Sequence, residues 1–144
     1  CVDRVGTTSV NVLNEVGRRL PLAGSSMGVA MLMALPKKEQ QALLRANRKA
    51  LRSNPAHRDR AYDAMWEHSH ALGLGLNLGD IVPGAASIGV AILNDSGRPV
   101  AAMGLSGPVG EFTEARIAYV RGSLGEEARL IARQEGDLIA ELDG

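Results

Sequence analysis

Two apolar runs around a short polar joint mark the centre of this chain. The stretch Ala85–Pro108 alternates apolar and small residues on both sides of Asn94–Gly97. Asn, Asp and Ser bond their own backbone in turns, and Gly accepts the positive φ that a tight turn needs. The pattern predicts a β-hairpin in which Leu93 lies opposite Arg98, so that Ser87 lies opposite Gly104.

The two faces of this hairpin differ, because side chains alternate across a strand. One face is large and apolar, as in an ordinary core: it carries Ile88, Ile92, Met103 and Leu105. The other face is small and partly polar: it carries Ala85, Ser87, Gly89, Ala91, Ala102, Gly104 and Ser106. Either a helix packs closely on the small face, or this face is the floor of a ligand site with serine hydroxyls as hydrogen-bonding groups.

Helical spacing predicts three helices before the hairpin. Val29–Leu35 is a short buried helix that Ser25 can cap and that Pro36 stops. Lys37–Arg52 is amphipathic, and its inner face is formed by Leu43, Leu44 and Leu51. A third helix follows the Asn54-Pro55 cap and ends at Gly73; its apolar positions are Tyr62, Met65, Trp66 and Leu72.

The remaining apolar patterns complete the predicted order. Residues 1–5 and Ser9–Leu13 favour two short strands, and Leu74–Asp80 favours a strand that runs into a loop. Phe112–Leu142 is a long helix with Thr113 as its cap. Three glycines inside it favour a bend or a break: Gly122, Gly125 and Gly136. The order predicts an α+β domain with an antiparallel sheet flanked by helices.

Size and composition fit one domain with an aliphatic core. The chain has 144 residues, 45% of them hydrophobic and only 3% aromatic. Sixteen basic residues balance sixteen acidic ones, so charge alone gives no reason to expect binding to nucleic acid or to a membrane. The single cysteine, Cys1, excludes an internal disulfide and favours a cytoplasmic location. The longest apolar run, Met27–Leu35, is too short to span a bilayer.

Few residues outside the hairpin indicate chemistry. A Ser25 cap leaves the backbone N–H groups of Ser26, Met27 and Gly28 unpaired, and these amides form a small anion site. The histidines show no metal-ligand spacing: they are His57, His68 and His70. The outer face of the second helix is basic, through Arg45, Arg48, Lys49 and Arg52, and is read as a solvated surface rather than a phosphate track.

At this point a family resemblance can be stated. The run Val16–Ala30, then Gly73-Leu74 with its polar loop, then Ser106-Gly107-Pro108 before a helix that Thr113 initiates, resembles the effector-binding domain of IclR-type bacterial transcription regulators. The resemblance implies that residues 1–144 form a GAF/profilin-like sensor domain without cofactor or catalysis. It also implies homodimers or homotetramers, and DNA contact only through an N-terminal winged helix-turn-helix domain that is absent from this chain.

The resemblance also implies a binding site for a small-molecule effector, often a carboxylate. The effector would lie between the start of the buried helix and the small face of the hairpin. Carried over by position, its polar groups are the amides of Ser26 and Met27, the side chain of Asn77, and the hairpin residues Ser87, Gly104 and Ser106. The apolar walls would be Val10, Val12 and Leu20.

Four positions depart from the pattern of the family. Ala23 stands where a histidine is usual, Val29 where a lysine is usual, Asn77 where an acidic residue is common, and Gly104 where a serine is usual. Each change removes a charge or a hydroxyl, which favours an effector larger and more apolar than a two-carbon acid, such as an aromatic or branched carboxylate.

Two readings from other classes stay open. An N-terminal cysteine can be both nucleophile and base, so Cys1 is compatible with a self-processed hydrolase. Alternatively, the small hairpin face only receives a helix, and the domain is a ligand-free dimerisation or interaction module.

Overall fold

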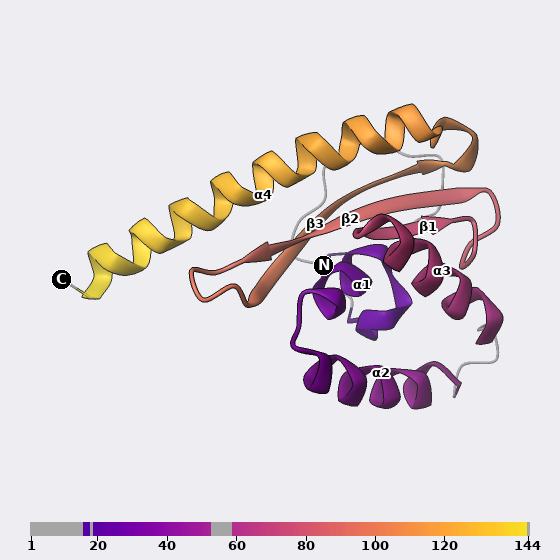
Figure 1. The fold of residues 1–144 in the computed structure, drawn as a ribbon, viewed down its shortest axis with the longest axis horizontal. Coiled ribbons are helices and arrows are strands. Elements are labelled where there is room, and N and C mark those ends of the chain that lie inside the picture. Colours follow the sequence, from indigo (N-terminus) through magenta and orange to yellow (C-terminus); the bar gives the residue numbers. More distant parts are fainter. Residues whose placement is uncertain (1–15, 18, 53–58, 144) are drawn as a thin grey trace.

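A computed structural model describes residues 16–17, 19–52 and 59–143 (Figure 1). Within these ranges it contains four α-helices, three strands and two 3-10 helices. In chain order they are η1 (Leu22–Gly24), α1 (Ser26–Met33), α2 (Lys37–Arg52), α3 (Asp59–Leu72), β1 (Gly75–Leu78), β2 (Ala85–Leu93), β3 (Pro99–Pro108), η2 (Val109–Glu111) and α4 (Glu114–Asp143). The strands predicted over residues 1–5 and 9–13, and the Asn54-Pro55 cap, lie outside the described residues.

The strands form one antiparallel sheet in the order β1-β2-β3. In Figure 1, α4 runs along one side of this sheet, and α1, α2 and α3 lie on the other side. The prediction of an α+β domain with helices flanking an antiparallel sheet is therefore confirmed.

The core between α4 and the sheet is made of large apolar side chains. Leu76 of β1 pairs with Ile88 of β2, which pairs with Leu105 of β3, so the three form one row across the sheet. The buried cluster on this side consists of Leu74, Leu76, Ala86, Ile88, Phe112, Ile117 and Val120. Leu105, at the end of the row, is 38% exposed, since α4 lies over β2 more than over β3. It is therefore less buried than predicted.

A second core lies within the layer of α1, α2 and α3. Its buried members are Ala23, Val29, Leu32, Leu51, Tyr62 and Met65. Leu51 belongs to the inner face of α2 as predicted, and Leu44 packs against the cluster, but Leu43 is 37% exposed and lies outside it. The prediction for Leu43 was wrong because three consecutive inward positions would exceed the width of the apolar stripe of a helix.

The hairpin joins β2 to β3 in a register two residues away from the predicted one. Leu93 pairs with Pro99 instead of Arg98, and an irregularity between Ile92 and Leu93 adds a second residue of shift. Ser87 consequently lies opposite Ser106 rather than Gly104. Because side chains alternate with a period of two, a shift of two leaves every residue on its predicted face. The faces were predicted correctly and the pairs were not.

Helix α4 is continuous, in contrast to the predicted bend or break. Thr113 caps it as predicted, since the Thr113 hydroxyl accepts a hydrogen bond from the Arg116 amide at 3.3 Å. Three turns of its apolar stripe pack on the sheet, at Ile117, Val120 and Ala128. This packing outweighs the weak helix propensity of the glycines, whose intrinsic cost is only about 1 kcal/mol each relative to alanine.

Candidate effector site

The start of α1 follows from the local sequence. The Ser25 hydroxyl accepts a hydrogen bond from the Gly28 amide at 3.1 Å, and the Ser25 carbonyl accepts one from Val29 at 2.9 Å. The Gly28 amide is therefore paired, unlike the sequence-based prediction. Within the described residues, the amides of Ser26 and Met27 have no acceptor. These two N–H groups, at the positive end of the helix dipole, are the anion-binding part of the site.

Three glycines place this helix start directly on the sheet. Gly75, Gly89 and Gly104 pair with one another across β1, β2 and β3 and form a row. A Cβ atom on Gly75 would collide with the Ser26 carbonyl, and one on Gly89 would lie 2.7 Å from the Met27 Cα. A Cβ on Gly104 would lie 2.9 Å from the Met27 side chain. The backbone of α1 thus fills the space above this glycine row.

A polar row runs beside the glycine row on the same face. Asn77, Ser87 and Ser106 pair across the three strands. The Ser26 hydroxyl donates a hydrogen bond to the Ser87 hydroxyl at 2.9 Å, which ties the start of α1 to the middle of this polar row. The hydroxyl of Ser106 makes no hydrogen bond within the described residues. The register shift thus brings together two serines that the predicted register kept apart.

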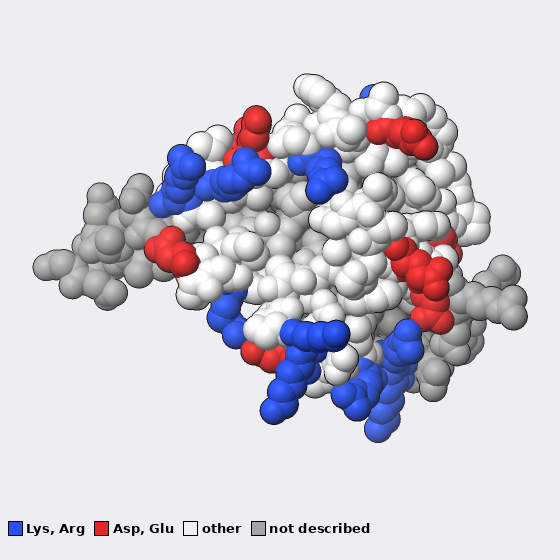
Figure 2. Space-filling model, in the orientation of Figure 1, with Lys and Arg blue, Asp and Glu red and all other residues white. Residues whose placement is uncertain are grey.

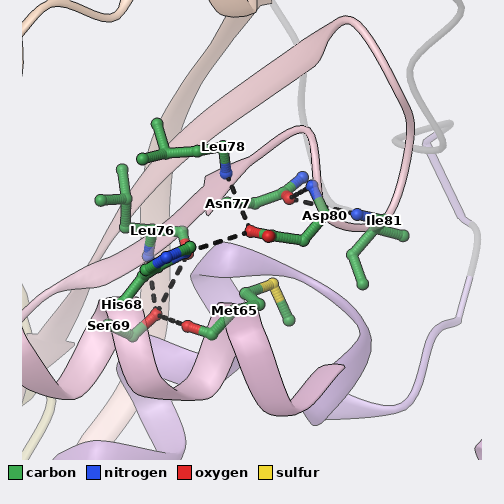
Figure 3. A network of polar contacts seen from close by, with 8 residues as sticks. All are labelled: Met65, His68, Ser69, Leu76, Asn77, Leu78, Asp80 and Ile81. Atoms are coloured by element: carbon green, nitrogen blue, oxygen red, sulfur yellow. Dashed lines mark hydrogen bonds and ion pairs between the residues drawn. The ribbon is translucent and has the colours of Figure 1, made fainter. Parts of the chain in front are cut away.

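Asn77 has a structural task of its own at the end of β1 (Figure 3). Its side-chain oxygen accepts hydrogen bonds from the amides of Asp80, at 2.9 Å, and Ile81, at 3.3 Å. The Asp80 carboxylate in turn accepts the Leu78 amide at 3.1 Å and lies 3.5 Å from Nδ1 of His68. Asn77 therefore shapes the loop after β1 with its oxygen, and only its side-chain nitrogen remains as a donor for a ligand.

Ser69 is a buried polar residue that the sequence analysis missed. Its hydroxyl donates to the Met65 carbonyl at 2.6 Å, with the Leu76 carbonyl at 3.3 Å, and accepts a hydrogen bond from the Leu76 amide at 2.9 Å. These contacts fasten β1 to α3 at the strand that carries Asn77 (Figure 3). The signal was present in the sequence, because Ser69 continues the helical spacing of Tyr62, Met65 and Trp66.

The remaining predicted site residues are placed as follows. Val10 and Val12 lie outside the described residues. Leu20, the third predicted wall residue, is 37% exposed. Of the four departures from the family pattern, Asn77 and Gly104 lie on the sheet at the site, whereas Ala23 and Val29 are buried in the core of the helical layer.

Other chemistry is weakly represented in the described ranges. No group of three or more His, Cys, Asp or Glu residues there could hold a metal ion. None of the helices in those ranges has the length and apolarity needed to cross a membrane. Figure 2 shows Lys and Arg side chains gathered over α2. Part of this basic surface is paired within the chain, since Arg48 contacts Asp63 at 2.7 Å.

A helix start seated on the small face of an antiparallel sheet, with a second helix on the opposite face, defines the class of this domain: it has the fold of the C-terminal domains of bacterial transcriptional regulators. The family model described as bacterial transcriptional regulator IclR C-terminal matches residues 2–133. The chain belongs to this family.

Solved structures agree with the family assignment. The IclR protein of Thermotoga maritima is 27% identical, with a TM-score of 0.72, and the match covers 92% of this chain and 55% of that one. The Agobacterium tumefaciens repressor BlcR is 25% identical, with a TM-score of 0.65 and coverage of 86% and 51%. HmgR of Pseudomonas aeruginosa is 26% identical, with a TM-score of 0.61 and coverage of 89% and 50%.

The chain spans about half the length of these regulators. Comparison with curated protein sequences finds no match. The family and the structural neighbours are transcriptional regulators rather than enzymes.

Proposed function

We propose that this domain senses a small organic acid, which binds between the start of α1 and the polar row Asn77–Ser87–Ser106. The observation that carries the proposal is the hydrogen bond between the hydroxyls of Ser26 and Ser87, at 2.9 Å. It holds the first turn of α1, with its two unpaired amides, beside the hydroxyl-bearing strands. Membership of the IclR C-terminal family supports the same reading.

The chemistry of the site suits a carboxylate. The carboxylate would accept hydrogen bonds from the amides of Ser26 and Met27, where the helix dipole also favours negative charge. The Ser106 hydroxyl and the side-chain nitrogen of Asn77 supply further donors. Charge-assisted hydrogen bonds of this kind are shorter and stronger than neutral ones, so a few donors suffice to orient a small ligand.

The rest of the effector is inferred from the two departures that lie on the sheet. Asn77 removes a negative charge that would repel an acid, and Gly104 removes a side chain beside Met27. Both changes favour an effector larger and more apolar than a two-carbon acid, such as an aromatic or branched carboxylate. Ala23 and Val29 are buried in the helical core, so they do not contribute to this argument.

The proposed mechanism is a shift between oligomer arrangements. An effector changes the spacing of DNA-binding modules only as far as its affinity differs between the arrangements. The DNA-binding step would belong to a winged helix-turn-helix domain outside this chain, in a cytoplasmic regulator that assembles as a homodimer or homotetramer. The domain itself needs no catalytic step.

Thermal unfolding with a panel of carboxylates, from glyoxylate and pyruvate to aromatic and branched acids, tests this proposal. A ligand at one hundred times its dissociation constant stabilises the folded state by about 2.7 kcal/mol, which raises the midpoint of a domain of this size by several degrees. Ser106→Ala should weaken binding by about 1–3 kcal/mol. Ser96→Ala, in the exposed hairpin turn, is the matched control and should leave binding unchanged.

The rival reading as a ligand-free interaction module also has an observation in its favour. The backbone of α1 already fills the space above Gly75 and Gly89, as close packing alone would require. That reading predicts no stabilisation by any acid in the panel, and no difference between Ser106→Ala and Ser96→Ala. Cys1, on which the hydrolase reading depends, lies outside the described residues.

A further inference from the structure

Two glycines in α4 have no role within the described fold. A Cβ atom on Gly122 would meet nothing within 4 Å, and one on Gly125 would meet only the end of the Arg129 side chain, at 3.9 Å. Neither glycine has a positive φ. Glycine destabilises a helix interior relative to alanine. Their bare backbone is therefore unexplained by contacts inside the described chain, in contrast to Gly75 and Gly89 under α1.

These glycines belong to the side of α4 that faces away from the sheet. Exposed residues recur along this side at alternating steps of four and three, which places them in one stripe. The stripe consists of Ala115, Tyr119, Gly122, Glu126 and Arg129. Tyr119 is 75% exposed, more than any other large hydrophobic residue in the described ranges. In Figure 1 no described element covers this side of α4, and Figure 2 shows mostly uncharged atoms over its first half.

We propose that this stripe is a contact between two copies of the chain, with the two α4 helices antiparallel and crossing midway between Tyr119 and Gly122. In this arrangement Tyr119 of each copy lies over Gly122 of the other. Small residues allow helix backbones to approach closely, and the tyrosine ring loses its exposure. The contact is isologous, so one surface serves both copies and the assembly closes as a pair.

The charges beside the stripe are self-complementary in this arrangement only. In an antiparallel pair related by a two-fold axis, residues on the same flank of the two helices meet. Arg116 and Glu127 share one flank, and Glu114 and Arg129 share the other. The crossing point brings Arg116 within one helical turn of Glu127 of the second copy, and Glu114 within one turn of its Arg129. A parallel pair would place each charge beside its own duplicate.

The charged side chains are available for these contacts. All four are exposed, and the only ion pair among them in the described chain is a long one, between Arg116 and Glu111 at 3.8 Å. Opposite charges on both flanks therefore specify a second copy of this chain rather than an unrelated partner. The inference goes beyond the proposed sensing function and does not depend on a ligand being bound.

Sedimentation velocity of the chain across the micromolar range tests the inference. We expect a concentration-dependent dimer, or a tetramer that contains this contact. Gly122→Ala should act in opposite directions on two readouts: it should raise the thermal midpoint of the dissociated monomer and weaken association by about tenfold or more. A substitution that merely damages the fold would lower both.

Charge exchange provides the second arm of the test. Arg116→Glu and Glu127→Arg should each weaken association by about tenfold, and the double variant should restore it to within about threefold of the parent. Arg45→Glu makes the same charge change on α2 and should leave association unaltered. A chain that stays monomeric, or an association that Gly122→Ala and Arg116→Glu leave unchanged, or a double variant without recovery, would overturn the inference.

Discussion

The two faces of the sheet receive their helices in opposite ways. Helix α4 meets the sheet through large side chains, such as Ile117 on Ile88, so the helix and strand backbones stay apart. Helix α1 meets the other face through its backbone, because Gly75 and Gly89 offer no side chains there. The first contact resembles an ordinary core; the second brings main-chain amides and serine hydroxyls to within hydrogen-bond distance of the strands.

This difference explains why the candidate site lies on the small-residue face. A helix held away by leucines and isoleucines would keep its first-turn amides far from any polar group on the strands. Close approach over glycines removes that separation, and the Ser26–Ser87 hydrogen bond of 2.9 Å results. The two faces should therefore respond differently to substitution: one loses stability when side chains are removed, and the other when they are added.

Removing the central side chain of the α4 face should have the largest effect. Ile88 is fully buried between Leu76 and the residues of α4. Ile88→Ala should lower the free energy of unfolding by about 2–5 kcal/mol, since it loses apolar burial and leaves a cavity. Urea unfolding measures the change. Leu105→Ala, on the same row but partly exposed, is the control; a cost as large as that of Ile88→Ala would contradict the different burial of the two positions.

Adding one methyl group to the α1 face should come next. In Gly89→Ala the new Cβ would lie 2.7 Å from the backbone of Met27, so α1 has to shift. We expect a loss of about 1–3 kcal/mol in the free energy of unfolding. Gly110→Ala adds the same methyl group where nothing lies within 4 Å and should be close to neutral. Equal effects of the two variants would show that α1 is not held against the sheet at this distance.

The hydrogen bond across the small-residue face should contribute less. Ser87→Ala leaves the buried Ser26 hydroxyl without its acceptor, which should cost about 1–3 kcal/mol of stability. The double variant Ser26→Ala with Ser87→Ala should cost less than the sum of the single changes, because it removes both partners together. Chemical unfolding of the four proteins gives this coupling. Strict additivity would mean that the two hydroxyls do not interact.

Ser106→Ala separates stability from binding on the same polar row. Its hydroxyl makes no hydrogen bond within the described residues, so we expect a free energy of unfolding close to that of the parent. The proposed effector should nevertheless bind more weakly to this variant. A large loss of stability would instead assign Ser106 a structural role.

The smallest expected effect is the pH dependence of an ion pair between the helical layer and the hairpin. Arg98 holds Glu39 through two hydrogen bonds, of 3.2 and 2.8 Å, and these lower the pKa of Glu39 below its ordinary value of 4.5. A lowered pKa means that the ionised carboxylate stabilises the folded state above the unfolded-state value, and that this contribution disappears as the pH falls through the folded-state value.

Glu39→Gln tests this sign. The variant should be slightly less stable than the parent at neutral pH, and the difference should vanish in acid, below the ordinary pKa of glutamate. The effect is small because both side chains are about half exposed to solvent. Glu67→Gln, on the exposed side of α3, is the control. A stability difference that grows in acid would contradict the assignment.

Local patterns were sufficient for much of the fold. The bounds of α2 follow from its amphipathic run, the end of α3 follows from Gly73, and the cap of α4 follows from Thr113. Alternation along the hairpin also assigned each residue of β2 and β3 to the correct face. These features depend on neighbours in the chain and on the fixed periods of helices and strands, so they can be read without tertiary contacts.

Tertiary contacts decided the rest of the site. Ser69 was missed because its partners, beyond its own helix, lie on the backbone of β1. The continuity of α4 through Gly122 and Gly125 depends on the packing of Ile117, Val120 and Ala128 rather than on helix propensity. Asn77 has the site position that the resemblance implied, but its oxygen holds the following loop.

The sequence by itself determined which residues form the small-residue face and which helix could begin beside it, because side-chain alternation and capping are local. Only the tertiary structure decided that Ser87 lies opposite Ser106 and beside Ser26. The pairing depends on the length of the hairpin turn and on an irregularity at Ile92–Leu93, and the approach of α1 depends on glycines in three separate strands. Such distances are set by contacts between segments far apart in the chain, which a local pattern does not encode.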